Sequence, residues 1–211
     1  MVTQLINELP ETPAIATRGN AMLAQFYLDH QQPDKAKAYI HKTAFIPETA
    51  WSVIGPFDNT NGTGYDKAFI PEMATQFDTT LTYNGYNRQI GWTQQTDETF
   101  DGYVNFDTIF GGNLNWVAAY AWTTLTVLNE RTAHIYFGSD DQAKIWLNGE
   151  PVFTDSTAHP VVIDSITIPV TLKPGKNSLL VKVCDEEIFW GFYLRIADTD
   201  GKPFDDLTIS E

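Results

Sequence analysis

Cysteine, cationic residues and long apolar runs are all scarce in this chain. Its single cysteine, Cys184, cannot form an internal disulfide and lies in an apolar strand pattern, where a small buried side chain is expected. Lysine and arginine number 13 against 27 aspartates and glutamates, which gives a formal net charge of -14 at pH 7. A surface of that sign repels a phosphate backbone, and no apolar run is long enough to cross a bilayer. We therefore expect no nucleic-acid partner and no membrane insertion.

Familiar catalytic motifs are absent as well. The four histidines, His30, His41, His134 and His159, show no metal-ligand spacing. The chain has no Gly-x-Ser-x-Gly elbow and no phosphate-binding loop, and nothing around Cys184 is typical of a nucleophile. The sequence therefore predicts a non-catalytic protein, and it leaves cellular compartment and oligomeric state open.

Apolar and aromatic side chains are abundant, at 43% and 13% of the 211 residues, with six tryptophans. This composition indicates a folded chain that favours strands. A chain of this length can bury a core without help from metals or disulfides.

Residues 1–46 are expected to form a helical hairpin, because apolar side chains recur at helical spacing on both sides of the proline in QQPDK. The stretch AMLAQFYLDHQQPDKAKAYIHKT resembles one tetratricopeptide repeat, with Ala24, Tyr27, Ala36 and Tyr39 near its small and aromatic positions. One such unit cannot bury its own apolar face, so the resemblance implies packing on the following domain or on repeats outside this chain. An ordinary helical hairpin attached to a β domain is the alternative.

Residues 47–211 show period-two alternation instead. Strand patterns follow one another at short intervals, separated by turn sequences such as GSDD, NGEP and KPGK. No long helical pattern intervenes, so we predict one antiparallel two-sheet β-sandwich of the jelly-roll kind. The expected fold class is mainly β, with the short helical hairpin in front.

Three segments of this second region resemble a known module. GSDDQAKIWLNGEPVF, VTLKPGKNSLLVKV and FWGFYLRIAD together resemble the galactose-binding-like jelly roll of the sugar-binding domains in family 2 glycoside hydrolases. WSVIGPFDNTNGTGYDKAFIPE resembles the opening of a variant that often follows tetratricopeptide repeats in large bacterial proteins. The resemblance implies an accessory scaffold, since the catalytic acids of those enzymes lie in another domain.

The segment SDDQAKIWLNGEPV also resembles part of the protective-antigen insert family. Adhesin members of that family use two adjacent aspartates to bind calcium, which in turn holds a sugar. The resemblance implies that Asp140 and Asp141 are those residues here. Gln142 stands where glycine is usual, and Asn148 replaces a later aspartate.

Asp140 and Asp141 thus allow two interpretations. Adjacent aspartates after Gly138-Ser139 make a good turn, because aspartate side chains accept hydrogen bonds from nearby backbone N–H groups. Calcium ligation would need further oxygens from another loop, and Asp155 and Asp164 are near enough in sequence to supply them.

The candidate sugar-binding residues are aromatic or amide side chains in or near predicted turns. Alternation places Trp146 on the face opposite Ala143, Ile145 and Leu147, as either a stacking platform or a packing residue. The candidates are Trp146, Asn148, Trp92, Trp116 and Tyr65.

Together these patterns predict a non-catalytic carbohydrate-binding or accessory module of a larger bacterial protein, with calcium as the one cofactor implied. In this mechanism an aromatic ring stacks on a sugar face while Asp, Asn or backbone groups bind hydroxyls. The alternative is a structural or protein-interaction domain without a sugar ligand, because an unpaired helical repeat and exposed strand edges both need covering.

Overall fold

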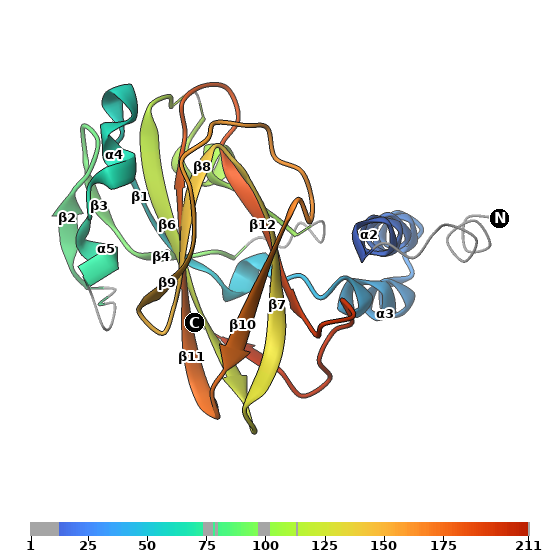
Figure 1. Ribbon diagram of the computed structural model, residues 1–211. Helices are drawn as coiled ribbons and strands as arrows, with labels where there is room; N and C mark the ends of the chain where they lie inside the picture. The colour runs from blue at the N-terminus through green and yellow to red at the C-terminus, as the bar shows by residue number, and fades with distance from the viewer. Residues whose placement is uncertain (1–12, 74–77, 79, 97–101, 113, 211) are drawn as a thin grey trace.

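Two antiparallel β-sheets packed face to face form most of the molecule, with helices at both sides (Figure 1). This arrangement confirms the predicted mainly β sandwich with a short N-terminal helical hairpin. The first residues of that hairpin prediction fall outside the described part of the chain. The computed structural model describes residues 13–73, 78, 80–96, 102–112 and 114–210.

The hairpin consists of α2 (Pro13–Asp29) and α3 (Pro33–Thr43). Pro33 stands in the first turn of α3, where its missing N–H removes no helical hydrogen bond. The rings of Tyr27 and Tyr39 stack between the two helices with their centroids 5.4 Å apart. Among the described residues, no helix has the length and apolar character that a membrane span requires. The likeness to a tetratricopeptide repeat stays a prediction.

A short extended segment joins the hairpin to the sandwich. Phe45 forms a β-bridge with Arg195, and Ile46 N–H donates to Leu194 O at 3.3 Å. Ile46 is buried in the core between the sheets. A division into two domains after residue 46 stays a prediction. The residues just before that boundary are themselves bonded to β12 of the sandwich.

The larger sheet has seven strands in the order β4-β1-β6-β11-β8-β9, with β13 beside one end of β6. Its longest pairing joins β6 and β11, from Gly175 opposite Val127 to Cys184 opposite Ala118. The strands are β1 (Ser52–Asp58), β4 (Thr93–Gln94), β6 (Val117–Val127), β8 (Gln142–Leu147), β9 (Glu150–Asp155), β11 (Gly175–Cys184) and β13 (Thr208–Ser210).

The smaller sheet has four strands in the order β10-β7-β12-β5. They are β5 (Tyr103–Asn105), β7 (Arg131–Asp140), β10 (Ile166–Leu172) and β12 (Gly191–Ala197). The edge strands β9 and β10 each carry a proline, Pro151 and Pro169, which has no N–H to offer an added strand. These two edges are therefore poor templates for self-assembly.

The main core lies between the sheets and is rich in aromatic side chains. Alternation along β8 holds as predicted, because Ala143, Ile145 and Leu147 are buried in this core and the residues between them are not. A short helix, α6 (Phe106–Phe110), closes one end, and the Asn105 side chain caps it by accepting from Thr108 N–H at 3.0 Å.

A second apolar layer covers the outer face of the larger sheet. The segment after β1 supplies it, on the side of the molecule opposite the helical hairpin (Figure 1). The elements of this segment are a 3-10 turn (Thr60–Gly62), α4 (Thr63–Asp66), α5 (Ile70–Met73), β2 (Thr82–Asn84) and β3 (Gln89–Gly91), and another 3-10 turn (Glu48–Ala50) precedes β1.

Candidate functional site

Three aspartates come together at one end of the sandwich, and we call Asp140, Asp141 and Asp185 the acidic rim. Asp140 is the last residue of β7, Asp141 stands at the corner before β8, and Asp185 directly follows β11. Backbone hydrogen bonds close this end: Asp141 N–H donates to Cys184 O at 3.3 Å, and Asp185 N–H donates to Val117 O at 2.7 Å. Strand ends from both sheets therefore lie side by side at the rim.

The carboxylates of Asp140 and Asp141 accept hydrogen bonds from backbone groups far away in sequence. Both residues are 7% exposed, and the peptide bond between them is cis. Asp140 Oδ2 accepts from Val161 N–H at 3.3 Å, and Asp141 Oδ2 accepts from Glu186 N–H at 2.9 Å. The turn interpretation expected donors within the turn itself, whereas these bonds hold two other loops against the corner.

Asp185 is the rim residue that the sequence did not single out. Its side chain is fully buried, and neither carboxylate oxygen has a hydrogen-bond partner among the residues that the structure describes. Burial raises the pKa of Asp185 to about 8, and the charges of Asp141, Asp107 and Asp140 add to the rise. Burial also raises the pKa of Asp140 to about 6, with Asp141 adding to it. The rim therefore holds protons at pH values where surface aspartates are ionised.

The other acids near the corner are engaged elsewhere. Asp155 Oδ2 lies 3.1 Å from His159 Nε2, and both oxygens of Asp164 bind the guanidinium of Arg195 at 2.8 to 3.0 Å. In the described part of the chain, no group of three or more His, Cys, Asp or Glu side chains that could hold a metal ion is found. An ion at the rim would therefore need carbonyl oxygens in addition to the carboxylates, a combination that calcium accepts.

Trp146 and Asn148 line a common hollow on the outer face of the larger sheet, together with Trp122. Trp146 is half-buried there, on the face that alternation predicted. The Asn148 amide is bonded within the protein, since its Oδ1 accepts from Ser178 N–H at 3.0 Å and its Nδ2 donates to Asn177 Oδ1 at 2.9 Å. Asn148 therefore shapes the hollow more than it offers groups to a ligand.

The remaining three candidates lie apart from that hollow. Trp92 is buried in the second apolar layer and has no open face on which a sugar could stack. Trp116 is half-buried beside the rim, and its backbone N–H donates to Glu186 O at 3.0 Å. The Tyr65 ring is covered by Lys144, whose Nζ lies 4.1 Å from the ring centroid. The candidates thus do not form a single site.

Two exposed apolar residues stand next to the rim in the loop after β11. Ile188 is 74% exposed and Phe189 is 66% exposed. The sequence singled out no residue of this loop as a candidate, and so both apolar residues and the buried Asp185 were missed. The available signal was a pair of large apolar side chains inside an acidic loop.

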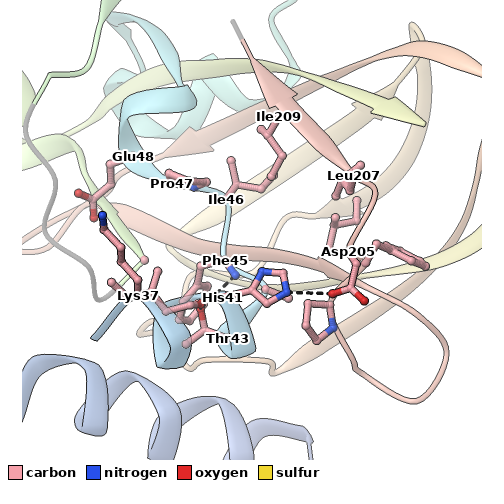
Figure 2. A pocket seen from close by; sticks show the side chains of 16 residues that line it. Lys37, His41, Thr43, Phe45, Ile46, Pro47, Glu48, Asp205, Leu207 and Ile209 are labelled. Atoms are coloured by element: carbon pink, nitrogen blue, oxygen red, sulfur yellow. Dashed lines mark hydrogen bonds and ion pairs between the residues drawn. The ribbon is translucent and has the colours of Figure 1, made fainter. Parts of the chain in front are cut away.

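A separate cavity of about 500 Å³ lies between α3 and the sandwich, as Figure 2 shows. Its apolar walls include Ile46, Leu207 and Ile209, which come from the linker and the C-terminal segment. His41 Nε2 and Asp205 Oδ1 approach within 3.1 Å beside it, and both side chains are largely exposed. None of the sequence-predicted site residues lines this cavity.

No protein-family model matches the chain, and no curated protein sequence matches it. Among solved structures, the PA14 domain of the MpAFP antifreeze protein is similar over 47% of this chain and 54% of its own length, with 19% identity and a TM-score of 0.37. A PA14 sugar-binding domain from an RTX adhesin is similar over 38% of this chain and 44% of its own, with 21% identity and a TM-score of 0.31. The chain thus spans about half the length of each of these two structures.

A beta-glucosidase from Kluyveromyces marxianus in complex with glucose is similar over 55% of this chain and 14% of its own length, with 12% identity and a TM-score of 0.38. All three likenesses are distant, with identities of 12% to 21% and TM-scores below 0.4.

Proposed function

We propose that the chain is a non-catalytic carbohydrate-binding module of a larger bacterial protein and that it holds its ligand at the acidic rim with the help of calcium. The observation that carries this proposal is the carboxylate of Asp185, which is fully buried beside Asp140 and Asp141 and has no partner among the described residues. Buried carboxylates are normally paired or hydrogen-bonded, and an exception calls for a missing ligand, a proton or an ion.

Calcium fits the chemistry of this donor set. It takes six to eight oxygen ligands, and carboxylates, backbone carbonyls and water all serve. Asp140 and Asp141 would contribute carboxylate oxygens, the buried Asp185 beside them would add negative charge, and backbone carbonyls and water would complete the ligand set. When bound, calcium supplies open coordination positions for the hydroxyl oxygens of a sugar.

Residues around the rim would orient the sugar. Phe189 and Ile188 are exposed next to Asp185, so an apolar sugar face can stack there while its hydroxyls point toward the carboxylates. The hydrogen bond from Glu186 N–H to Asp141 Oδ2 holds this loop at the corner. The apolar and acidic parts of the proposed site are thereby fixed relative to each other.

A binding role fits the rim better than a catalytic one. The raised pKa values of its aspartates would suit a general acid, but a hydrolase needs its carboxylates to line a cleft. No rim aspartate lines the hollow beside Trp146 or the cavity shown in Figure 2. Burial raises the pKa of Cys184 to about 12, which suits a packing residue and not a nucleophile.

A protein-interaction role remains the second candidate because α2 exposes two large apolar side chains. Met22 and Phe26 are four residues apart and therefore share one face of the helix. This candidate predicts self-association that a Phe26→Ala variant weakens, measured by sedimentation. A concentration-independent monomer would count against it.

The test of the rim is a glycan array probed in millimolar calcium and again in excess EDTA. We expect calcium-dependent signals that disappear in an Asp140→Asn/Asp141→Asn variant, because the amides cannot supply charged oxygens. Asp205→Asn is the matched control, since that side chain is 96% exposed and lies beside the cavity at α3, away from the rim. An array without calcium-dependent signals, or calcium-dependent signals that the double variant retains, would contradict the proposal.

A further inference from the structure

The hollow that contains Trp146 is a second feature with the chemistry of a ligand site, and we call it the outer hollow. It has a volume of about 370 Å³, within the range of small-molecule sites of roughly 300–1,000 Å³. Trp146 and Trp122 come from β8 and β6, and Glu72 and Met73 come from α5 above the sheet. The outer hollow therefore combines two indole rings with a carboxylate.

One wall of the outer hollow is fixed by a buried lysine. Lys182 is fully buried, and its Nζ donates to Glu72 Oε1 at 2.8 Å, to Lys67 O at 2.9 Å and to Tyr65 O at 3.2 Å. Tyr120 Oη also donates to Glu72 Oε1. Both bonds go to one oxygen of Glu72, so its position is set by the sheet while its charge is balanced by Lys182.

The opposite wall is the tight turn between β8 and β9. Asn148 and Gly149 have positive φ values of 54° and 80°, as the Asn-Gly sequence predicts for a two-residue hairpin. The Asn148 side chain ties this turn to Ser178 on β11, as described above. Both walls are thus held in place by the protein alone.

This composition suits a sugar ring. Aromatic side chains offer an apolar face to the C–H groups of a pyranose, and a neighbouring carboxylate accepts its hydroxyl protons. Trp146 provides the half-buried ring, Glu72 the carboxylate, and Ser178 a hydroxyl on the floor. Because Lys182 balances the charge of Glu72, the outer hollow favours a neutral ligand.

The outer hollow is separate from the acidic rim. Trp146 pairs with Leu180, whereas the rim begins one residue beyond the Cys184–Gln142 pair, so five residue steps or roughly 17 Å of strand separate them. The rim lies at the end of the strands, and the outer hollow lies on the outer face of the larger sheet. A ligand at one therefore does not need the other.

We propose that the outer hollow is a second carbohydrate site, which stacks a neutral sugar ring on Trp146, binds its hydroxyls through Glu72 and requires no metal ion. This proposal stands independently of the calcium site at the rim.

The experiment is the same glycan array read in excess EDTA, with wild-type protein and four variants. We expect EDTA-resistant signals that fall about tenfold or more in Trp146→Ala, because the stacking face is removed. Met73→Arg should also lower them by crowding the mouth, and this variant should fold normally since Met73 is 67% exposed. Phe26→Ala, which removes an exposed aromatic ring on α2, and Asp140→Asn/Asp141→Asn should retain the signals in full.

Two results would overturn this proposal: wild-type protein without any signal in EDTA, or EDTA-resistant signals that neither Trp146→Ala nor Met73→Arg weakens. Thermal unfolding of each variant separates lost binding from lost fold, and Met73→Arg decides the matter if Trp146→Ala is unfolded. Calcium-dependent signals without EDTA-resistant ones would overturn this site and leave the rim proposal standing. The reverse pattern would overturn the rim proposal alone.

Discussion

Arg195 and Asp185 are both fully buried ionisable residues, yet their surroundings differ. The Arg195 guanidinium donates to both oxygens of Asp164 at 2.8 to 3.0 Å and to Gly201 O at 3.1 Å, and it lies 3.7 Å from the Tyr136 ring centroid. The carboxylate of Asp185 has no hydrogen-bond partner among the described residues. The same sandwich thus surrounds one buried ionisable group with partners and leaves the carboxylate of the other without them, so the two sites differ in hydrogen bonding and not in burial.

The largest loss of stability is expected from a substitution at Arg195. An Arg195→Met variant keeps the bulk of the side chain but leaves Asp164 buried without its partner. We expect the free energy of unfolding to fall by about 3–5 kcal/mol, the usual loss when one member of a buried ion pair is removed. Urea denaturation followed by tryptophan fluorescence measures it.

Arg88→Met is the control for that experiment, because Arg88 is exposed and, among the described residues, its guanidinium makes a single hydrogen bond, to Phe110 O at 3.0 Å. The free energy of unfolding of this variant should fall by at most about 1 kcal/mol. Equal losses in the two variants would show that burial does not set the contribution of Arg195.

At Asp185 the expected effect has the opposite sign. Its pKa of about 8 in the folded protein exceeds the ordinary aspartate value of 3.8, so the folded state holds a proton that the unfolded chain releases. The stability of the calcium-free protein should therefore fall as pH rises from about 4 to about 8. Asp185→Asn removes this titration. Above a pH of about 8 the variant should be more stable than wild type, by on the order of 1–3 kcal/mol in the free energy of unfolding.

Denaturation midpoints across that pH range, in excess EDTA, test the Asp185 prediction. Asp140→Asn is the matched variant, and it should flatten only the lower part of the profile because the pKa of Asp140 is about 6. A pH profile of Asp185→Asn that matches wild type would contradict the unpaired state of Asp185. Adding calcium should restore wild-type stability at high pH if the rim binds it.

The sequence predicted the parts of this structure that depend on local patterns. Period-two alternation placed Trp146 opposite the core residues of β8, and the proline of QQPDK marked the start of α3. Turn chemistry identified the Asp140–Asp141 corner and the Asn148-Gly149 hairpin. These features are set by neighbours within a few residues, so a single sequence was enough to predict them.

Features that depend on distant segments were not predictable in this way. Asp185 follows a strand and precedes two glutamates, so its sequence context is that of a solvated turn, but the packing of β6 beside β11 buries it. Asp164 was near enough in sequence to reach the rim, yet Arg195, 31 residues away, holds it elsewhere. Trp92 is buried because the segment after β1 folds over the larger sheet.

Removing the exposed ion pair of Arg131 and Asp206 should have the smallest effect on stability, although its geometry is as good as that of the Arg195–Asp164 pair. Arg131 Nη1 and Nη2 donate to the two oxygens of Asp206 at 2.5 and 2.6 Å, and the Arg131 guanidinium lowers the pKa of Asp206. The pair therefore stabilises the fold above the ordinary pKa of aspartate, and this contribution is lost as pH falls below it.

Water and salt screen a pair at the surface, so short distances alone do not make it strong. We expect Asp206→Asn to lower the urea midpoint slightly at low ionic strength and not at all in high salt. A loss that equals that of Arg195→Met, or one that salt leaves unchanged, would contradict this. Since the two pairs share bidentate geometry and differ in burial, the contrast between them isolates burial as the cause of the larger effect.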